Sequence, residues 1–148
     1  MVSIKKIKEL RNRTGVSLGE CKKALKESKG DIDQAEEHLK KLGKKVVQDR
    51  MDKEAGAGIV DSYIHSNKKI GVLLELGCET DFVARSDDFQ NLAHELCLQI
   101  ASPSPEDTPL LERKWVKDSS KTVKDLIEEV MGKLGEKIVI KRFEKYEL

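Results

Sequence analysis

The chain has 148 residues, enough for one sizeable hydrophobic core or two small ones. Charged residues make up 37% of it and hydrophobic residues 38%, a balance typical of a globular protein with solvated helical faces. Lysines and arginines nearly cancel aspartates and glutamates, which leaves a net charge of only +1. Binding to a phosphate backbone needs a concentrated positive field, so the overall charge predicts no nucleic-acid partner.

The chain also lacks the patterns of membrane and secreted proteins. No apolar run approaches the roughly 20 residues that cross a bilayer. The first residues enter an amphipathic pattern at once, without the apolar stretch of a signal peptide. Cys21, Cys78 and Cys97 are widely spaced and predict no disulfide framework. We therefore expect a cytoplasmic protein with no membrane partner.

Residues 1–43 show the pattern of three short helices. Their apolar residues recur on one helical face, and glycines mark the ends. Capping pairs open the second and third helices, Ser17 with Glu20 and Asp31 with Gln34. The expected helices begin near Ile4, Ser17 and Asp31 and end at Gly15, Gly30 and Gly43. A unit this small is only marginally stable, but it can form a separate domain.

Residues 44–57 are rich in charge and poor in large apolar side chains. They predict a linker that is either flexible or a helical extension of the third helix. After this linker the apolar period changes to two, which predicts strands over residues 59–65 and 69–76. A hairpin turn at residues 66–68 joins them. One face of the second strand holds Ile70, Val72, Leu74 and Leu76.

The remaining chain alternates between helix and strand patterns. Ser86 is expected to cap a helix that the proline-containing residues 102–105 end. A shorter helix is expected over residues 110–116, around the only tryptophan. A strongly periodic helix then runs from Thr122 to Gly135, and residues 138–146 alternate like a last strand. This half is predicted to be α+β, with helices covering one face of a three-stranded antiparallel sheet.

A polar turn follows the second strand, over residues 77–85. It holds one acidic residue and one aromatic residue at its tip, Asp81 and Phe82. A phenylalanine in this place has no obvious core of its own to fill, which favours insertion into a partner protein. By residue type alone, an isolated phenylalanine is usually a core residue, and an aspartate before a helix is often only a turn residue.

The turn sequence Thr80-Asp81-Phe82-Val83 closely resembles the signature of the elongation factor Ts family. Residues 10–15, 21–25 and 30–32 are similar to that family's ubiquitin-associated-like domain, and residues 135–138 with Arg142-Phe143 are similar to the end of its core. Several blocks in the right order are stronger support than one short motif. The resemblance implies a ubiquitin-associated-like helical domain with a linker helix over residues 1–52. An α+β core for dimerisation and exchange would follow over residues 53–148.

The resemblance also implies a function in translation elongation. It is that of a guanine-nucleotide exchange factor for elongation factor Tu, which acts by binding, without covalent chemistry and without a cofactor. Such a factor binds the GDP-bound partner, perturbs its magnesium site and promotes GDP release. Phe82 would wedge into the partner, and Thr80, Asp81 and Val83 would complete the intruding turn. The N-terminal domain would dock elsewhere on the partner through Arg11 and Leu18.

Two departures from the family pattern bear on partners. Relatives usually carry two apolar residues at the start of the second helix, whereas here Gly19 follows Leu18, which predicts a thinner N-terminal contact. Longer relatives have a second half-core and a protruding helical hairpin, for which this chain has no room. It resembles the short form, for which the resemblance implies a homodimer.

Two other classes of function were weighed on the residues alone. An enzyme would need Glu79, Asp81 and His94 to converge as acid and base, and their spacing does not support this. A protein-binding adaptor of the ubiquitin-associated type would use the N-terminal domain but would leave the turn at residues 80–83 without a purpose. Histidines and cysteines form no close pairs, so no metal site is predicted.

Overall fold

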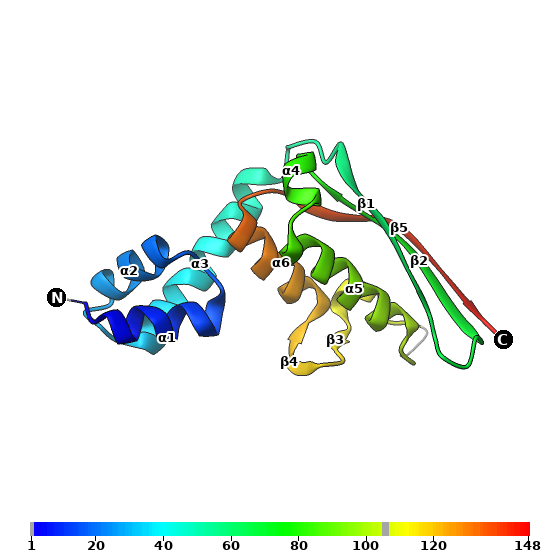
Figure 1. Cartoon of the computed structure of the whole chain (residues 1–148), viewed down its shortest axis with the longest axis horizontal. Helices are drawn as coiled ribbons and strands as arrows, with labels where there is room; N and C mark the ends of the chain where they lie inside the picture. Colours follow the sequence, from blue (N-terminus) through cyan, green and yellow to red (C-terminus); the bar gives the residue numbers. More distant parts are fainter. Residues whose placement is uncertain (1, 105–106) are drawn as a thin grey trace.

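The computed structural model describes residues 2–104 and 107–148; Pro105, part of the expected helix stop, therefore lies outside the described residues. The described residues form six α-helices, a three-stranded antiparallel sheet and a small two-stranded sheet. The N-terminal helices lie at one end of the molecule and the larger sheet lies at the other, with α5 (Asp87–Ala101) and α6 (Val123–Leu134) between them (Figure 1). No helix among the described residues is long and apolar enough to cross a membrane.

Three helices make up the N-terminal end: α1 (Ile4–Thr14), α2 (Leu18–Glu27) and α3 (Ile32–Arg50). The expected caps open two of them, because the side chains of Ser17 and Asp31 accept hydrogen bonds from the backbone N–H of Glu20 and Gln34. The helices bury a first hydrophobic cluster between them, formed by Leu10, Cys21, Ala24, Leu25, Ala35 and Leu39.

The expected end of the third helix at Gly43 is wrong, and the helical alternative for the following residues is the one observed. Helix α3 continues to Arg50. Gly43 lies where α3 crosses α6, opposite Gly132. The two glycines let the helix backbones approach closely, so this contact offsets the low helix propensity of glycine. Val47, beyond the crossing, packs against the cluster of the second half.

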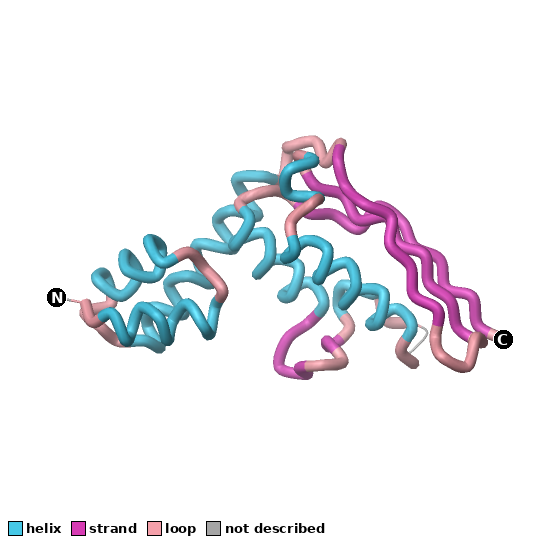
Figure 2. Tube along the Cα trace, in the orientation of Figure 1, coloured by secondary structure: helices cyan, strands magenta, loops and turns pink. Residues whose placement is uncertain are grey.

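The larger sheet contains β1 (Ala57–Ile64), β2 (Ile70–Cys78) and β5 (Ile138–Glu147) in the order β1-β2-β5, all antiparallel. The predicted hairpin between β1 and β2 is present, and its turn is closed by a 2.8 Å hydrogen bond from the N–H of Lys68 to the carbonyl of His65. Helices cover only one face of this sheet (Figure 2). The predicted α+β architecture with a three-stranded antiparallel sheet is confirmed.

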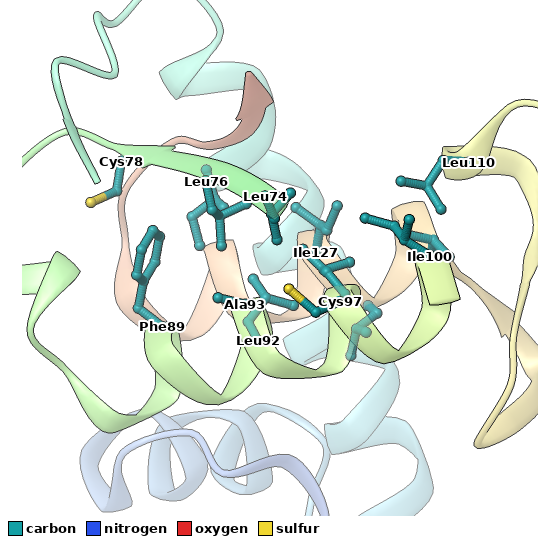
Figure 3. Packing of buried hydrophobic residues seen from close by; sticks show 14 of the residues in the cluster. Leu74, Leu76, Cys78, Phe89, Leu92, Ala93, Cys97, Ile100, Leu110 and Ile127 are labelled. Carbon is teal, nitrogen blue, oxygen red and sulfur yellow. The ribbon is translucent and has the colours of Figure 1, made fainter. Parts of the chain in front are cut away.

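A second hydrophobic cluster fills the space between the covered face of the sheet and the helices. Side chains from β2 point toward α5, and Ile127 of α6 lies beside them (Figure 3). The apolar residues that recur at helical spacing along α5 are buried, as are three of the four predicted residues of β2, in agreement with their periods of 3.6 and 2. These buried residues are Val72, Leu74, Leu76, Phe89, Leu92, Ala93, Leu96 and Ile100.

The helix expected over residues 110–116 is wrong. Only a single 3-10 turn, η1 (Leu110–Glu112), forms there, and β3 (Lys114–Trp115) then pairs with β4 (Asp118–Thr122). The cause is Gln99 of α5, which is only 2% exposed. Its side chain donates a hydrogen bond to the carbonyl of Lys114 (3.2 Å) and accepts one from the N–H of Val116 (2.9 Å). A helix would need these backbone groups for its own hydrogen bonds.

The glycine crossing gives a prediction with a built-in control. A methyl group added at Gly132 would lie 2.7 Å from the Cα of Gly43, whereas one added at Gly43 would lie 3.7 Å from the Cα of Gly132. We expect Gly132→Ala to lower the free energy of unfolding by roughly 1–3 kcal/mol through overpacking. We expect Gly43→Ala to leave it unchanged or raise it by up to about 1 kcal/mol through better helix propensity. Urea denaturation of both variants is the measurement, and equal stabilities would contradict the asymmetry.

Candidate functional site

The turn after β2 contains a short helix that the sequence analysis missed. The hydroxyl of Thr80 accepts a hydrogen bond from the N–H of Val83 (3.3 Å) and caps α4 (Asp81–Ala84), a single helical turn. Ser86 then caps α5 as predicted, by accepting a hydrogen bond from the N–H of Phe89 (3.3 Å). The available signal was Thr80 itself, because threonine is a preferred N-cap residue. We call residues 79–85 the Phe82 turn.

This one helical turn separates an outward face from an inward face. Phe82 is 85% exposed, the largest exposed fraction of any phenylalanine in the chain. Thr80 and Asp81 are exposed beside it. Val83 is only 5% exposed and belongs to the second cluster, as does Ala84. Three of the four predicted turn residues therefore share the surface, while the side chain of Val83 anchors the turn from inside.

The base of the Phe82 turn is held by Glu136, which follows α6. One carboxylate oxygen of Glu136 accepts hydrogen bonds from the backbone N–H groups of Glu79 (3.2 Å) and Thr80 (3.0 Å). The other accepts a 2.7 Å hydrogen bond from the hydroxyl of Thr80. Hydrogen bonds to an ionised acceptor are roughly twice as strong as neutral ones. The start of the turn is therefore fixed at three atoms by a single side chain.

Glu79 makes the reverse connection. Its carboxylate accepts a 2.7 Å hydrogen bond from the backbone N–H of Lys137, at the start of β5, and pairs with Arg50 of α3 at 3.2 Å. The ammonium group of Lys137 in turn donates to the carbonyl of Met51 (2.8 Å). We call Arg50, Glu79, Thr80, Glu136 and Lys137 the junction. It joins the ends of α3 and β2 to the start of β5, where the three meet beside α4 (Figure 1). The sequence analysis missed it.

The two predicted docking residues of the N-terminal helices lie on either side of Gly15. Arg11 is exposed in the last turn of α1, and Leu18, at the start of α2, is 46% exposed. Gly15 adopts a φ of +68° and lies against the side chain of Lys133 of α6. Lys133 forms a 3.2 Å ion pair with Asp88, in the first turn of α5. Lys133 therefore connects the loop between α1 and α2 to α5, the helix that follows the Phe82 turn.

The three cysteines are buried structural side chains. Burial raises the pKa of the Cys97 thiol to about 12, with the charge of Asp61 adding to the effect. Burial also raises the pKa of Cys78, whose thiol donates a hydrogen bond to the carbonyl of Thr80 (3.2 Å). All three thiols are free. Thiols with raised pKa values stay protonated at neutral pH and are poor nucleophiles.

The described contacts include none among Glu79, Asp81 and His94, the acid and base candidates of the sequence. The carboxylate of Glu79 is engaged by Arg50 and Lys137, and His94 lies about two helical turns into α5 on its exposed side. Over residues 2–104 and 107–148, no three histidine, cysteine or acidic side chains lie close enough to hold a metal ion. What the described surface presents is an exposed aromatic ring on a rigid base, an arrangement suited to contact with another protein.

Comparison with known proteins identifies the family. A family model described as Elongation factor TS matches residues 79–148, a segment that begins at the Phe82 turn. The chain is 38% identical to the protein named Elongation factor Ts from Thermoanaerobacter sp. (strain X514), over 99% of this chain and 95% of that relative. It is also 38% identical to the Elongation factor Ts of Moorella thermoacetica, over 100% of this chain and 96% of the relative. The chain belongs to the elongation factor Ts family of translation elongation factors.

These relatives are longer than the chain. The alignment with the Thermoanaerobacter protein extends over 193 positions, whereas the chain has 148 residues. At least 45 aligned positions therefore hold no residue of this chain, although nearly all of both proteins is covered. The Phe82 turn, the junction and both hydrophobic clusters are present without those residues.

Proposed function

We propose that this chain is a guanine-nucleotide exchange factor for elongation factor Tu and acts in the cytoplasm during translation elongation. It would bind the GDP-bound partner, perturb its magnesium site and promote GDP release, with no covalent step. Membership of the elongation factor Ts family supports this proposal. The observation that carries it is the exposed ring of Phe82, 85% accessible, on a turn anchored by the buried side chains of Val83 and Ala84.

The mechanism would be preferential binding of the nucleotide-free partner. Coupling between two ligands of one protein is reciprocal. The fold by which this chain lowers the affinity of the partner for GDP therefore equals the fold by which GDP lowers the affinity of the partner for this chain. Burying one phenylalanine contributes roughly 1.5–3 kcal/mol, and each tenfold change in affinity requires about 1.4 kcal/mol. Insertion of Phe82 would therefore account for one to two decades of GDP affinity. Other contacts have to supply the rest.

Neighbouring residues would complete the contact. Asp81 is exposed beside the ring, and among the described residues no lysine, arginine or histidine nitrogen lies within 4 Å of its carboxylate. It would be free to make polar contacts near the displaced magnesium ion, which takes phosphate oxygens of the nucleotide as ligands. Thr80 and Val83 would fix the turn from its exposed and buried sides.

The N-terminal part would dock separately. We propose that residues 1–52 form a ubiquitin-associated-like domain with a linker helix, and that residues 53–148 form the exchange core. Arg11 and Leu18 would provide the contact of this domain with the partner. An added methyl group at Gly19 would meet nothing within 4 Å, so the surface beside Leu18 is open and less apolar than in relatives with two apolar residues there.

We also propose a homodimer, formed through the uncovered face of the larger sheet. A sheet face that meets only water usually carries polar side chains. Here four large apolar or aromatic side chains are 55–77% exposed on that face: Val60, Ile64, Leu73 and Tyr146. The same face carries Glu75 paired with Arg142 at 2.7 Å, so it holds charges of both signs. A two-fold axis would bring the apolar residues together and allow these charges to meet their opposites.

The exchange proposal is tested by release of fluorescent GDP from elongation factor Tu at catalytic concentrations of this protein. We expect marked acceleration by the wild-type chain. Phe82→Ala should reduce the exchange rate by about 10–100-fold, because it removes the side chain whose burial drives binding. Its fold should be unchanged. Leu111→Ala, which removes an exposed apolar side chain elsewhere, is the control and should exchange normally.

Wild-type rates in the Phe82→Ala variant would exclude the wedge. Binding of elongation factor Tu without any acceleration by the wild-type chain would favour the adaptor function instead.

The dimer is tested by sedimentation equilibrium. Leu73→Glu places a charge at the centre of the proposed interface and should raise the dimer dissociation constant about tenfold or more, a change of roughly 1.4 kcal/mol. Ile4→Glu, at a similarly exposed position on α1, should leave it unchanged. A wild-type chain that is monomeric at working concentration and fully active would contradict the proposal.

A further inference from the structure

We infer that Glu136 is a positioning residue for Phe82: its carboxylate holds the turn in one orientation before the partner binds. This inference rests on the proposed exchange function. Glu136 lies outside the turn and is half-buried, and its carboxylate is bonded to the turn, so it would act through the turn.

Glu136 spends most of its hydrogen-bonding capacity on the start of the Phe82 turn. Its two oxygens accept three hydrogen bonds, from the N–H groups of Glu79 and Thr80 and from the hydroxyl of Thr80. A carboxylate has about four acceptor positions, so most of its capacity is used on two consecutive residues. Neither of these N–H groups has another partner in the sheet, because β2 ends at Cys78. Without Glu136, both would turn to solvent.

Thr80 connects Glu136 to the helical turn that carries the ring of Phe82. The hydroxyl of Thr80 both donates to Glu136 (2.7 Å) and accepts from the N–H of Val83 (3.3 Å). The carbonyl of Thr80 accepts from the N–H of Ala84 (3.1 Å). Two hydrogen bonds of the single turn of α4 therefore end on Thr80, which Glu136 holds, and a third, from the N–H of Arg85, ends on the adjacent Asp81. An isolated helical turn does not persist alone, because nucleation is unfavourable.

Glu79 makes a reciprocal contact with the segment that contains Glu136. The carboxylate of Glu136 accepts hydrogen bonds from N–H groups that follow β2, and the carboxylate of Glu79 accepts one from the N–H of Lys137, next to Glu136. Each of the two segments therefore supplies both a carboxylate acceptor and a backbone donor to the other. Arg50 extends this connection to α3 through its ion pair with Glu79 (3.2 Å). The Glu79 side chain is only 14% exposed, so water screens this pair less than a surface pair.

The consequence is preorganisation. A turn that is ordered before binding avoids the loss of conformational entropy when the partner binds. The ring of Phe82 has few contacts with its own chain, so the backbone of the turn is what determines its direction. Loss of the Glu136 contacts should therefore weaken exchange even though the ring itself is intact.

A double-mutant cycle tests the inference. Glu136→Ala should reduce exchange about tenfold or more, the loss expected when one or two residues must become ordered on binding. In a Phe82→Ala background the same change should have little further effect, because there is no ring left to position. Glu136→Gln keeps an acceptor oxygen and should recover most of the activity. Glu129→Ala, which removes an exposed glutamate from α6, is the matched control. If Glu136→Ala reduces exchange equally in both backgrounds, it acts through general structure and the inference is wrong.

A second readout does not depend on exchange activity. In the wild-type chain the amide hydrogens of Glu79 and Thr80 should exchange slowly with solvent, and a fluorine label on Phe82 should give one narrow NMR signal. In Glu136→Ala both amides should exchange rapidly, and the label should broaden or split. Unchanged amide exchange and an unchanged signal would overturn the inference. If the wild-type chain showed no nucleotide exchange, the proposed function would fail, while this measurement would still decide whether Glu136 holds the turn.

Discussion

The rest of the site depends on two carboxylate hydrogen bonds: Glu136 accepts from the backbone N–H of Glu79, and Glu79 accepts from the backbone N–H of Lys137. The bonds join residues 57 and 58 positions apart in the chain, and they do so where β2 ends and β5 begins. Partly buried carboxylates are stable only when their oxygens are satisfied, and here backbone N–H groups and Arg50 satisfy them. The same contacts hold the start of the turn that carries the exposed ring of Phe82.

The two hydrophobic clusters are connected by helix α3. Helix α3 belongs to the first cluster but continues past Gly43 to the junction, where Arg50 pairs with Glu79. The close crossing at Gly43 and Gly132 fixes the direction of this helix relative to α6. Under the proposed function, the N-terminal docking residues and the Phe82 turn would approach the partner as one rigid unit. This arrangement is present although at least 45 positions of the alignment with a relative hold no residue of this chain.

Local patterns predicted much of the fold. The hairpin of β1 and β2 and the caps at Ser17, Asp31 and Ser86 follow from rules that act within a few residues. The errors arose where distant contacts decide. Gly43 has the sequence pattern of a helix end, but in the structure it lies opposite Gly132 within a continuous helix. Residues 110–116 have a helical pattern, but the side chain of Gln99 forms hydrogen bonds with two of their backbone groups. The junction left no local signal for the same reason, whereas the exposed Phe82 was visible because it lies in a short motif.

The central claim is that this chain binds elongation factor Tu in competition with GDP. The most direct measurement is the dissociation constant of the complex by calorimetry, first with nucleotide-free elongation factor Tu and then with saturating GDP and magnesium. Reciprocal coupling predicts that saturating GDP raises this constant by at least tenfold, with the same factor found for GDP when this chain is saturating. Equal dissociation constants in the two conditions would contradict the account.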